Sequence, residues 1–385
     1  MSAFEVLLTQ YQALPACSRS AVSAVVGACV ADAATRPLHW VYDRNVIEST
    51  FKDQARPEFW PTSLSPFYNL ETGKRSCYND ESLAMLQSLD PWSPSYESIS
   101  SFRPDLAKAS LLEMFSPSSA YAAALQLRAK AYDPSQRTVE RKPIPGPWQH
   151  SAITDFLKAV AEGKQETGSE TAETDGFCFA LPVIARLSAV DNDHEVRQTV
   201  TSAIRILASS DIALSHGLIR AEILRAIIRS QGSSSKVVMD IEERLSAARA
   251  LISTIVESTS SEPIVTEYRA VLALLPGCTD GSSRWGSEML SPDLLDAVES
   301  FGKACPDPGN FQASLLILLT TKSYTEAVRR NILAGGCNCS RANFLGAYMG
   351  ALFGIGGEDG IPFDWIQRTD KGLETMDLAI KAFGL

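Results

Sequence analysis

The sequence has little of what marks a nucleic-acid-binding protein. Its 385 residues include 35 Lys and Arg against 45 Asp and Glu, which gives a net charge of −10. No basic run is longer than the pairs Arg329-Arg330 and Arg141-Lys142. Because phosphate backbones repel an acidic protein that lacks a basic patch, we expect no nucleic-acid partner.

Long apolar runs and a cysteine framework are also missing. The longest apolar stretch, 21–34, has 14 residues and contains Asp32, whereas a membrane span needs about 20 residues. Glu5 occupies the place where a secretory signal has its apolar core. Eight scattered cysteines do not resemble the framework of a disulfide-rich domain. We therefore expect no membrane contact and a reduced protein in the cytoplasm.

Helical periodicity is what the sequence does contain. Apolar residues make up 45% of the chain, as in proteins with a full core. They recur at spacings of three and four, and alternating β-branched runs are nearly absent. We predict an all-α fold, a single large helix bundle over residues 1–385. The predicted helices cover 21–34, 80–89, 118–131, 153–160, 196–208, 218–228, 241–256, 311–319, 324–333 and 341–353.

Two segments differ from this pattern. The segment 165–175 has four acids and no base, which predicts a solvated loop or a linker between domains. The segment 40–78 holds eight aromatic residues in 39 positions. A long irregular segment rich in rings is either a lid over a flat ligand or a loop that its rings fix to the bundle. In the first case Trp40 and Tyr78 are candidates for contact with a base or ribose.

Asp32 and His39 are the first candidates for chemistry. Asp32 lies near the end of an otherwise small and apolar helix, where a carboxylate needs a hydrogen bond, a partner charge or a metal. A local bond at the helix end is the simpler alternative. His39 follows the helix-stopping Pro37 and is either structural or an acid–base group near neutral pH.

A second candidate set is the triplet Asn79, Asp80 and Glu81. These residues precede an apolar helical run, and Asn79 is a good N-cap while acids suit the first turn of a helix. Three oxygen-bearing side chains in a row at a helix start also suit a hard cation such as Mg²⁺. Spacing alone favours the cap.

The third set follows Gly335-Gly336, which permits a tight turn between two helices. Asn338 or Ser340 can cap the second helix, and Arg341 adds a cation beside its N-terminus, so the turn is a candidate cradle for a diphosphate. The pair Cys337 and Cys339 cannot close a zinc site without further ligands. Ala342, Gly346, Gly350 and Gly354 recur every four residues, and small residues also recur at 24, 27 and 31; together they predict that these two helices cross closely.

Four blocks of the sequence together resemble the ADP-ribosylglycohydrolase family, in particular its branch related to J-type crystallins and selenoprotein J. The blocks are GACVADAATRPLHW at 27–40, SCYNDESLAML at 76–86, PGPWQHSAITDFL at 145–157, and the long block at 305–354 that contains AGGCNCSRANF. The resemblance spans nearly the whole chain. It implies an all-α bundle that cleaves the glycosidic bond of ADP-ribose with two Mg²⁺ ions.

The resemblance also implies where the metals bind. The family's Thr-Asp-Asp triplet falls on Asn79, Asp80 and Glu81, and its second ligand set falls on 337–340. There both aspartates are replaced, by Cys337 and Cys339, and thiolates are poor ligands for Mg²⁺. The family's catalytic Glu falls on His39.

Three hypotheses follow from these residues. The first is a hydrolase of ADP-ribosyl or related N- or O-glycosidic bonds with an altered metal site, in which Asp80 and Glu81 activate water with support from Asp32 and His39. The second is an inactive member with a structural, crystallin-like role or a ligand-binding role. In the third, Cys337 and Cys339 bind Zn²⁺ with His39 or undergo redox exchange. We expect all six residues to meet in one cleft that binds an ADP-ribose-like molecule; the sequence leaves the oligomeric state open.

Overall fold

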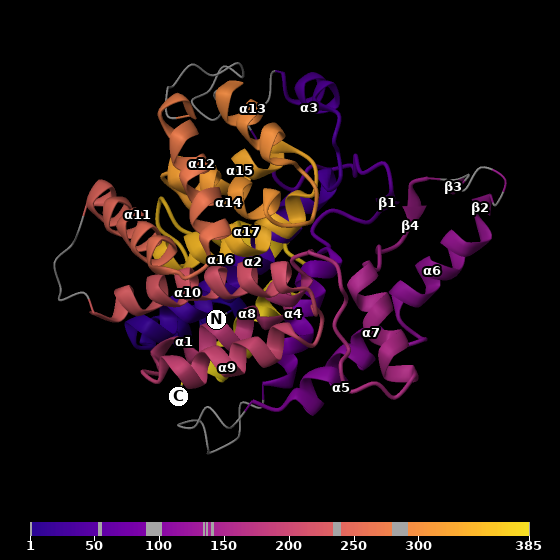
Figure 1. The fold of residues 1–385 in the computed structure, drawn as a ribbon, viewed down its shortest axis with the longest axis horizontal. Coiled ribbons are helices and arrows are strands. Elements are labelled where there is room, and N and C mark those ends of the chain that lie inside the picture. The colour runs from indigo at the N-terminus through magenta and orange to yellow at the C-terminus, as the bar shows by residue number, and fades with distance from the viewer. Residues whose placement is uncertain are drawn as a thin grey trace.

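The computed structural model describes residues 2–52, 56–89, 102–133, 135, 138–139, 142–233, 240–278 and 292–384. Within these ranges the regular structure is almost wholly helical, which confirms the predicted fold class (Figure 1). The helices are α1 (Ala3–Ala13), α2 (Ala16–Thr35), α3 (Arg44–Phe51), α4 (Cys77–Ser88), α5 (Pro104–Met114), α6 (Ala120–Lys130), α7 (Ser151–Ala161), α8 (Asp175–Arg186), α9 (Asp193–Ile204), α10 (Asp211–Ser233), α11 (Ile241–Ser258), α12 (Glu262–Cys278), α13 (Pro292–Phe301), α14 (Gly309–Thr320), α15 (Tyr324–Ala334), α16 (Asn338–Phe353), α17 (Phe363–Arg368) and α18 (Gly372–Phe383), with 3-10 turns at Arg36–Leu38 and Leu187–Ala189.

Helices α2 and α16 cross at the centre of the molecule through glycine. A Cβ atom placed on Gly346 would lie 2.3 Å from the carbonyl oxygen of Gly27, and one on Gly350 would lie 2.3 Å from that of Ser23. These distances are shorter than any carbon–oxygen contact, so the two backbones touch only because no side chain stands between them. The predicted close crossing of these helices is confirmed.

The apolar stretch of α2 is longer than the sequence pattern indicated. Together with the following turn it spans 23 residues, Ala16–Leu38, and passes the length and hydropathy test for a membrane span. Its apolar window is entirely buried inside the protein, so it is also a central core helix. Buried polar residues interrupt the apolar pattern, so the stretch appears shorter in the sequence. Ser20, for example, is buried, and its hydroxyl donates a hydrogen bond to the carbonyl oxygen of Ala351 at 2.8 Å.

The aromatic segment 40–78 is not one irregular loop. It contains α3, whose start is capped by Asp43, and the short strand β1 (Tyr68–Asn69). Its described backbone is tied to the core by Phe59 N–H, which donates to Ala34 O at 2.9 Å. Buried Arg36 donates to Glu71 O at 2.6 Å. These bonds support the interpretation that the middle of the segment is fixed to the bundle.

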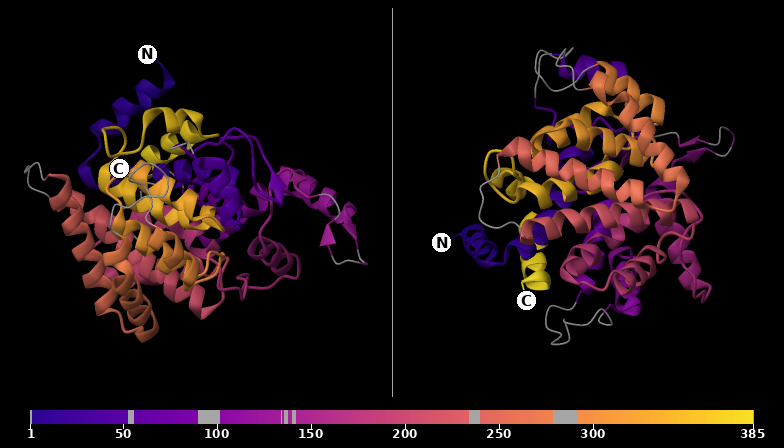
Figure 2. Two further views of the ribbon diagram at one scale, coloured as in Figure 1. Left: turned by 90° about the horizontal axis from the view of Figure 1, so that it is seen from above. Right: turned by 60° about the vertical axis from the view of Figure 1, so that its left-hand side comes forward.

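A short strand pair connects the aromatic segment 40–78 with the chain between α6 and α7. Strand β1 pairs in parallel with β4 (Ile144–Pro145), while β2 (Tyr132–Asp133) and β3 (Thr138–Val139) form an antiparallel pair. Figures 1 and 2 show α6 and this second pair projecting from the side of the bundle. Strand β4 precedes α7, whose N-cap residue His150 packs against Tyr78 in the first turn of α4, with ring centres 4.0 Å apart.

Helix α8 was missed by the periodicity. Nearly all of its residues are buried, so it has no polar face, and it contains Gly176 and Pro182, which argue against a helix. The acidic segment 165–175 therefore does not simply lie in solvent. It ends at Asp175, which is 1% exposed and opens α8.

Candidate functional site

Asp32 holds the start of α4. Its two carboxylate oxygens accept hydrogen bonds from the Ser76 backbone N–H at 2.7 Å and from the Ser76 hydroxyl at 2.6 Å. Ser76 is the N-cap, so the prediction that Asn79 caps this helix is wrong: the helix starts three residues earlier because Asp32 from α2 fixes its first residue. Burial raises the pKa of Asp32 to about 6.

His39 and Cys337 do meet. His39 Nε2 lies 3.3 Å from the Cys337 sulfur, while His39 Nδ1 shares a 2.7 Å hydrogen bond with the hydroxyl of Tyr68. Two further groups reach the same sulfur, the hydroxyl of Tyr78 at 3.5 Å and the thiol of Cys305 at 3.0 Å. Burial opposes ionisation of Cys337, but the bonds from Cys305 and His39 hold its pKa well below the ordinary thiol value.

The two cysteines of the Cys-x-Cys pair face different surroundings. The Cys339 sulfur lies 3.9 Å from the backbone oxygen of Asp32 and makes no bond with Cys337. The sulfur that accompanies Cys337 comes instead from Cys305. Within the described ranges, His39, Cys337 and Cys339 do not form a group with metal-ligand spacing.

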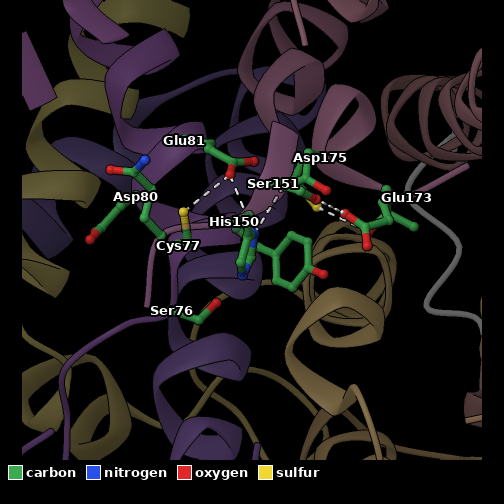
Figure 3. Close-up of polar contacts among 12 residues, drawn as sticks. Ser76, Cys77, Asp80, Glu81, His150, Ser151, Glu173 and Asp175 are labelled. Carbon is green, nitrogen blue, oxygen red and sulfur yellow. Dashed lines mark hydrogen bonds and ion pairs between the residues drawn. The ribbon is translucent and has the colours of Figure 1, made fainter. Parts of the chain in front are cut away.

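Asp80 is engaged elsewhere. Its carboxylate pairs with Arg75 at 2.6 Å and accepts a hydrogen bond from Tyr121 at 2.8 Å. In Figure 3 it points away from His150 and Asp175. The neighbouring Asn79 is buried and donates to Asn343 at 3.0 Å.

These contacts do not fit the Mg²⁺ ions that the family resemblance implies. Asp80 is already neutralised by Arg75, and the second ligand set offers the thiols of Cys337 and Cys339 where Mg²⁺ requires oxygen.

The third residue of the triplet faces the opposite way and joins a buried cluster. Glu81 Oε1 accepts a hydrogen bond from the Cys77 thiol at 3.3 Å and lies 3.6 Å from His150 Nδ1. The same ring nitrogen lies 2.9 Å from Asp175 Oδ1 (Figure 3). We call Cys77, Glu81, His150 and Asp175 the Glu81 cluster.

The electrostatics of the Glu81 cluster follow from its burial. All four side chains are at most about 5% exposed. Burial and the neighbouring Asp175 carboxylate raise the pKa of Glu81 well above its usual range. Burial alone would lower the pKa of His150, but Cys77 and Asp175 offset this and leave it well above the ordinary value.

A pocket of about 350 Å³ opens directly above His150. Its aromatic walls are Trp40, Tyr78 and Trp148, and the guanidinium of Arg128 lies 4.2 Å from the ring centre of Trp148. Polar groups complete the lining. The full set is Trp40, Tyr78, Arg128, Trp148, Gln149, His150, Ser151, Thr154, Asp155, Glu173 and Cys305.

Two carboxylates belong to this pocket. Glu173 is half-buried and accepts a hydrogen bond from the Ser151 hydroxyl at 3.0 Å. Burial and the nearby Asp175 raise the pKa of Glu173 to about 7. Asp155 is exposed and accepts a bond from Ser169 at 2.6 Å. The pocket thus contains a carboxyl group that exchanges its proton near neutral pH.

Trp40 connects the pocket to the buried thiol. Its ring stacks on His39, with ring centres 4.3 Å apart, and meets the edge of Trp148 at 5.5 Å. Its backbone has φ of 65°, in the left-handed region that non-glycine residues rarely adopt. A hydrogen bond from its N–H to Gly336 O at 2.8 Å holds this conformation. Such local strain is often found at ligand sites.

The predicted diphosphate cradle at 335–341 is used internally. The N–H groups of Gly336 and Cys337 donate to the carbonyl oxygens of Val41 and Lys303. Arg341 is fully buried and donates to Asn331 at 2.9 Å. Asn338 and Ser340 are buried too, and neither is the N-cap of α16, which is Cys337, so that capping prediction is wrong. None of the three side chains lines the pocket.

Several residues of the site were not identified from the sequence, and these are Cys77, Arg128, Trp148, His150, Asp155, Glu173, Asp175 and Cys305. Trp148 and His150 lie in the block 145–157 that carried part of the family resemblance, but no role was assigned to them. Glu173 and Asp175 lie in the acidic segment. One feature of the sequence could have indicated Glu173 and Asp175: they are the last acids of the segment and directly precede the apolar residues of α8, so they lie at the start of a buried helix.

A second cavity, of about 660 Å³, lies apart from these residues among α8, α9, α10 and α11. Its walls are largely apolar, with residues such as Val200, Leu218 and Ile255. Its charged rim is already paired, for example Arg225 with Asp193 at 2.6 Å. Its half-buried carboxylate, Glu222, is paired with Arg197, and no thiol among the described residues lines it, so the smaller pocket is the better candidate for chemistry.

Comparison with known proteins agrees with the resemblance. The family model described as ADP-ribosylglycohydrolase matches residues 15–385. Crystallin J1A of Tripedalia cystophora is 28% identical over 361 residues, covering 93% of this chain and 94% of its own. Crystallin J1B of the same organism is 26% identical over 362 residues, with the same coverage.

A solved structure described as an ADP-ribosylglycohydrolase-related protein complex has the same fold. Its TM-score is 0.58 at 16% identity, and the alignment covers 96% of this chain and 98% of that one. At this identity the likeness concerns the fold alone. With the family model matched over almost the whole length, the chain belongs to the ADP-ribosylglycohydrolase family and is similar to its J-crystallins.

Proposed function

We propose that this protein binds an ADP-ribose-like ligand in the pocket above His150 and hydrolyses its ribosyl glycosidic bond without Mg²⁺. The observation that carries the proposal is the lining of the pocket, which places Glu173 next to the aromatic walls. Membership of the family supports the substrate class. The unsuitable donors at the family's Mg²⁺ positions support the altered chemistry.

The pocket offers complementary groups for each part of such a ligand. The rings of Trp40 and Trp148 present flat apolar surface to a base. The Arg128 guanidinium, half-buried beside Trp148, supplies a cation for a phosphate. Glu173 and Asp155 lie among the same walls and accept hydrogen bonds from sugar hydroxyls or act on the bond itself.

The chemistry needs two carboxyl groups in different protonation states. Glycoside hydrolysis passes through an oxocarbenium-like state, in which an acid protonates the leaving atom and a base activates water. Glu173, with a pKa of about 7, supplies the proton. The exposed Asp155 accepts a proton from the attacking water. The bond between the anomeric carbon and the leaving group breaks, a carbon–oxygen bond to water forms, and the proton count is conserved.

The test is release of ADP-ribose from ADP-ribosylated protein by the purified chain, with a chelator present and with added Mg²⁺. We expect equal turnover in both conditions. Glu173→Gln should abolish most of this turnover. Glu170→Gln is its matched control and should keep wild-type turnover, because Glu170 is an exposed acid of the same segment that does not line the pocket. No turnover on any ADP-ribosylated substrate under any divalent metal would contradict the hydrolase proposal.

A second candidate is a structural or ligand-binding role without turnover. This role is favoured because the acids at the positions that match the family's active site make structural contacts: Asp32 accepts a hydrogen bond from Ser76, the N-cap residue of α4, and Asp80 pairs with Arg75. The curated relatives are named as crystallins, which supports the same view. Binding of ADP-ribose without hydrolysis would favour the ligand-binding form, and absence of both would favour the structural one.

A further inference from the structure

We propose that the Glu81 cluster binds one Zn²⁺ ion beneath the pocket. The proposal does not depend on the hydrolase activity, and its site shares only Glu81 with the residues that the family resemblance assigned to Mg²⁺. It also differs from the zinc site considered for the Cys-x-Cys pair, because it uses a different thiol, Cys77, and a different histidine, His150.

The fold brings the donors together from three elements. Cys77 and Glu81 are four residues apart in α4 and therefore lie on one face of that helix. His150 is the N-cap residue of α7, and Asp175 is the first residue of α8. In Figure 3 these side chains point toward one another. Within the described ranges, Cys77, Glu81 and His150 are the one group of three or more candidate ligands with metal-binding spacing.

The distances between ligand atoms match a tetrahedral zinc site. Zinc lies about 2.3 Å from a thiolate sulfur and about 2.0–2.2 Å from imidazole nitrogen or carboxylate oxygen, so neighbouring ligand atoms are about 3.3–3.7 Å apart. The Cys77 sulfur and Glu81 Oε1 are 3.3 Å apart. Glu81 Oε1 and His150 Nδ1 are 3.6 Å apart. All three ligand atoms lie within 4.8 Å of one another.

Two buried oxygen atoms point independently to a missing partner. Glu81 Oε2 and Asp175 Oδ2 are fully buried, and neither has a hydrogen-bond partner among the described residues. The only ion-pair partner of either carboxylate in this part of the chain is His150. Two carboxyl groups buried beside one imidazole are costly to ionise together in a protein interior, and burial beside Asp175 accordingly raises the pKa of Glu81. A divalent cation stabilises both carboxylates in their ionised form and coordinates the free oxygens.

The donor types select zinc. A thiol, an imidazole and carboxylates suit Zn²⁺, whereas Mg²⁺ and Ca²⁺ require oxygen ligands only. Asp175 either completes the coordination or accepts a hydrogen bond from a water on the metal. Binding requires the Cys77 thiolate and a free lone pair on His150 Nδ1, so protons are released as the ion enters. The ion then fixes the orientation of His150, which lines the pocket.

Cobalt titration of the full chain tests this inference. The protein is treated with chelator, kept reduced with a phosphine, and titrated with Co²⁺, which reports tetrahedral geometry and thiolate ligation by absorption. We expect one Co²⁺ per chain with a thiolate-to-cobalt charge-transfer band, and displacement by Zn²⁺. Cys77→Ser should abolish the band. Glu81→Gln should weaken binding more than tenfold, since even outer-shell changes cost about 10–100-fold.

Controls separate this site from other thiols. Cys29→Ser removes a buried cysteine outside the cluster and should leave the titration unchanged. Circular dichroism checks that each variant is folded, and Glu81→Gln keeps the side-chain shape should Cys77→Ser fail to fold. The inference is overturned if the wild type gives no thiolate band, if the band survives Cys77→Ser, or if it is lost in Cys337→Ser while Cys77→Ser retains it.

Discussion

The crossing of α2 and α16 and the pocket above His150 are built in opposite ways. At the crossing, backbone meets backbone at Gly27 and Gly346, and nothing larger than hydrogen fits. At the pocket, large and polar side chains such as Trp148 and Glu173 stand half-exposed around a space. One region is defined by side chains that are absent and the other by side chains that are present.

The difference teaches where substitutions act. The crossing contributes to stability, because any added atom must move a backbone. The half-exposed residues of the pocket lining, such as Arg128, Trp148 and Glu173, contribute little to the core, because they already border solvent. Changes at the crossing should therefore alter the free energy of unfolding, while changes in the pocket should alter ligand binding and turnover with little effect on unfolding. Four substitutions test this division.

The largest expected effect is on turnover in Glu173→Gln. Loss of a general acid typically costs about 100- to 10,000-fold in rate. Because burial raises the Glu173 pKa to about 7 and the protonated form is the active one, wild-type kcat/KM should fall as pH rises above about 7. The variant should lack this limb of the pH profile.

Urea unfolding of Glu173→Gln provides its control. The half-exposed amide can still accept the bond from Ser151, so the midpoint should match that of the wild type. A variant that unfolds early, or that retains wild-type turnover and pH dependence, would contradict the role of Glu173.

The largest expected effect on stability is in Gly346→Ala. The new Cβ would lie 2.3 Å from Gly27 O and 2.6 Å from the Ala31 side chain, so both helices must separate. Overpacking of this kind costs about 1–3 kcal/mol and occasionally more, and backbone contact places this site at the upper end. Urea unfolding measures it.

Gly232→Ala is the matched control for that substitution. Gly232 also lies within a helix, α10, but a Cβ there would lie 3.3 Å from the Cys17 side chain and no nearer than 4.0 Å to its backbone nitrogen. We expect a change of less than about 1 kcal/mol, with a gain from the better helix propensity of alanine. Equal effects at the two glycines would show that the crossing is not closely packed.

Asp32→Asn should change how stability depends on pH. Burial raises the folded-state pKa of Asp32 to about 6, above its ordinary value of 3.8. The folded protein therefore holds this proton more tightly than the unfolded chain, and stability from this group is lost as pH rises from about 4 through 6. The loss amounts to about 3 kcal/mol at most.

Unfolding free energies at pH 4.5 and 7 measure the effect. The asparagine variant does not titrate, so the wild type should lose stability relative to it between these two pH values. A wild type that gains stability relative to the variant over this interval would show that Asp32 is ionised at little cost in the fold.

The smallest expected effect is in Arg128→Gln. The guanidinium is half-buried over Trp148, so its attraction for a phosphate is partly screened by solvent. We expect ADP-ribose binding to weaken by roughly threefold to tenfold, about 1 kcal/mol. Adenosine, which lacks phosphate, serves as the control ligand and should bind equally to both proteins. If binding of both ligands weakens equally, Arg128 does not contact the phosphate and acts instead by holding the Trp148 ring in place.

The two regions also differ in what the sequence could reveal. The crossing was predictable, because glycine and alanine repeat at spacings of four within one helix. The pocket was predictable only in part. The sequence indicates Trp40 and Tyr78 as candidate ligand contacts, and both line it, but the other lining residues come from α6, α7 and the segments before α7, α8 and α14, and only tertiary packing brings them together. Helix α8 is buried on nearly all sides and contains Gly176 and Pro182, so the sequence does not indicate a helix there and predicts a loop at Asp175.

The sequence identifies Asp32 and Cys337 as candidate site residues, but it does not identify the residues that contact them. Asp32 was correctly noted as a carboxylate that needs a partner, yet the partner is Ser76, 44 positions away. Cys337 was noted with Cys339, yet the sulfur beside it is that of Cys305. In both cases the residue type indicated that the side chain requires a polar or sulfur partner, but only the three-dimensional fold shows which residue that partner is.

The central claim is that the pocket binds an ADP-ribose-like ligand without Mg²⁺, and calorimetry tests it most directly. ADP-ribose is titrated into the wild type and into Trp148→Ala, each with chelator and with Mg²⁺. The account predicts a measurable heat of binding in the wild type that is the same in both buffers and is lost in the variant. No heat at millimolar ligand in either buffer, or binding that requires Mg²⁺, would contradict it.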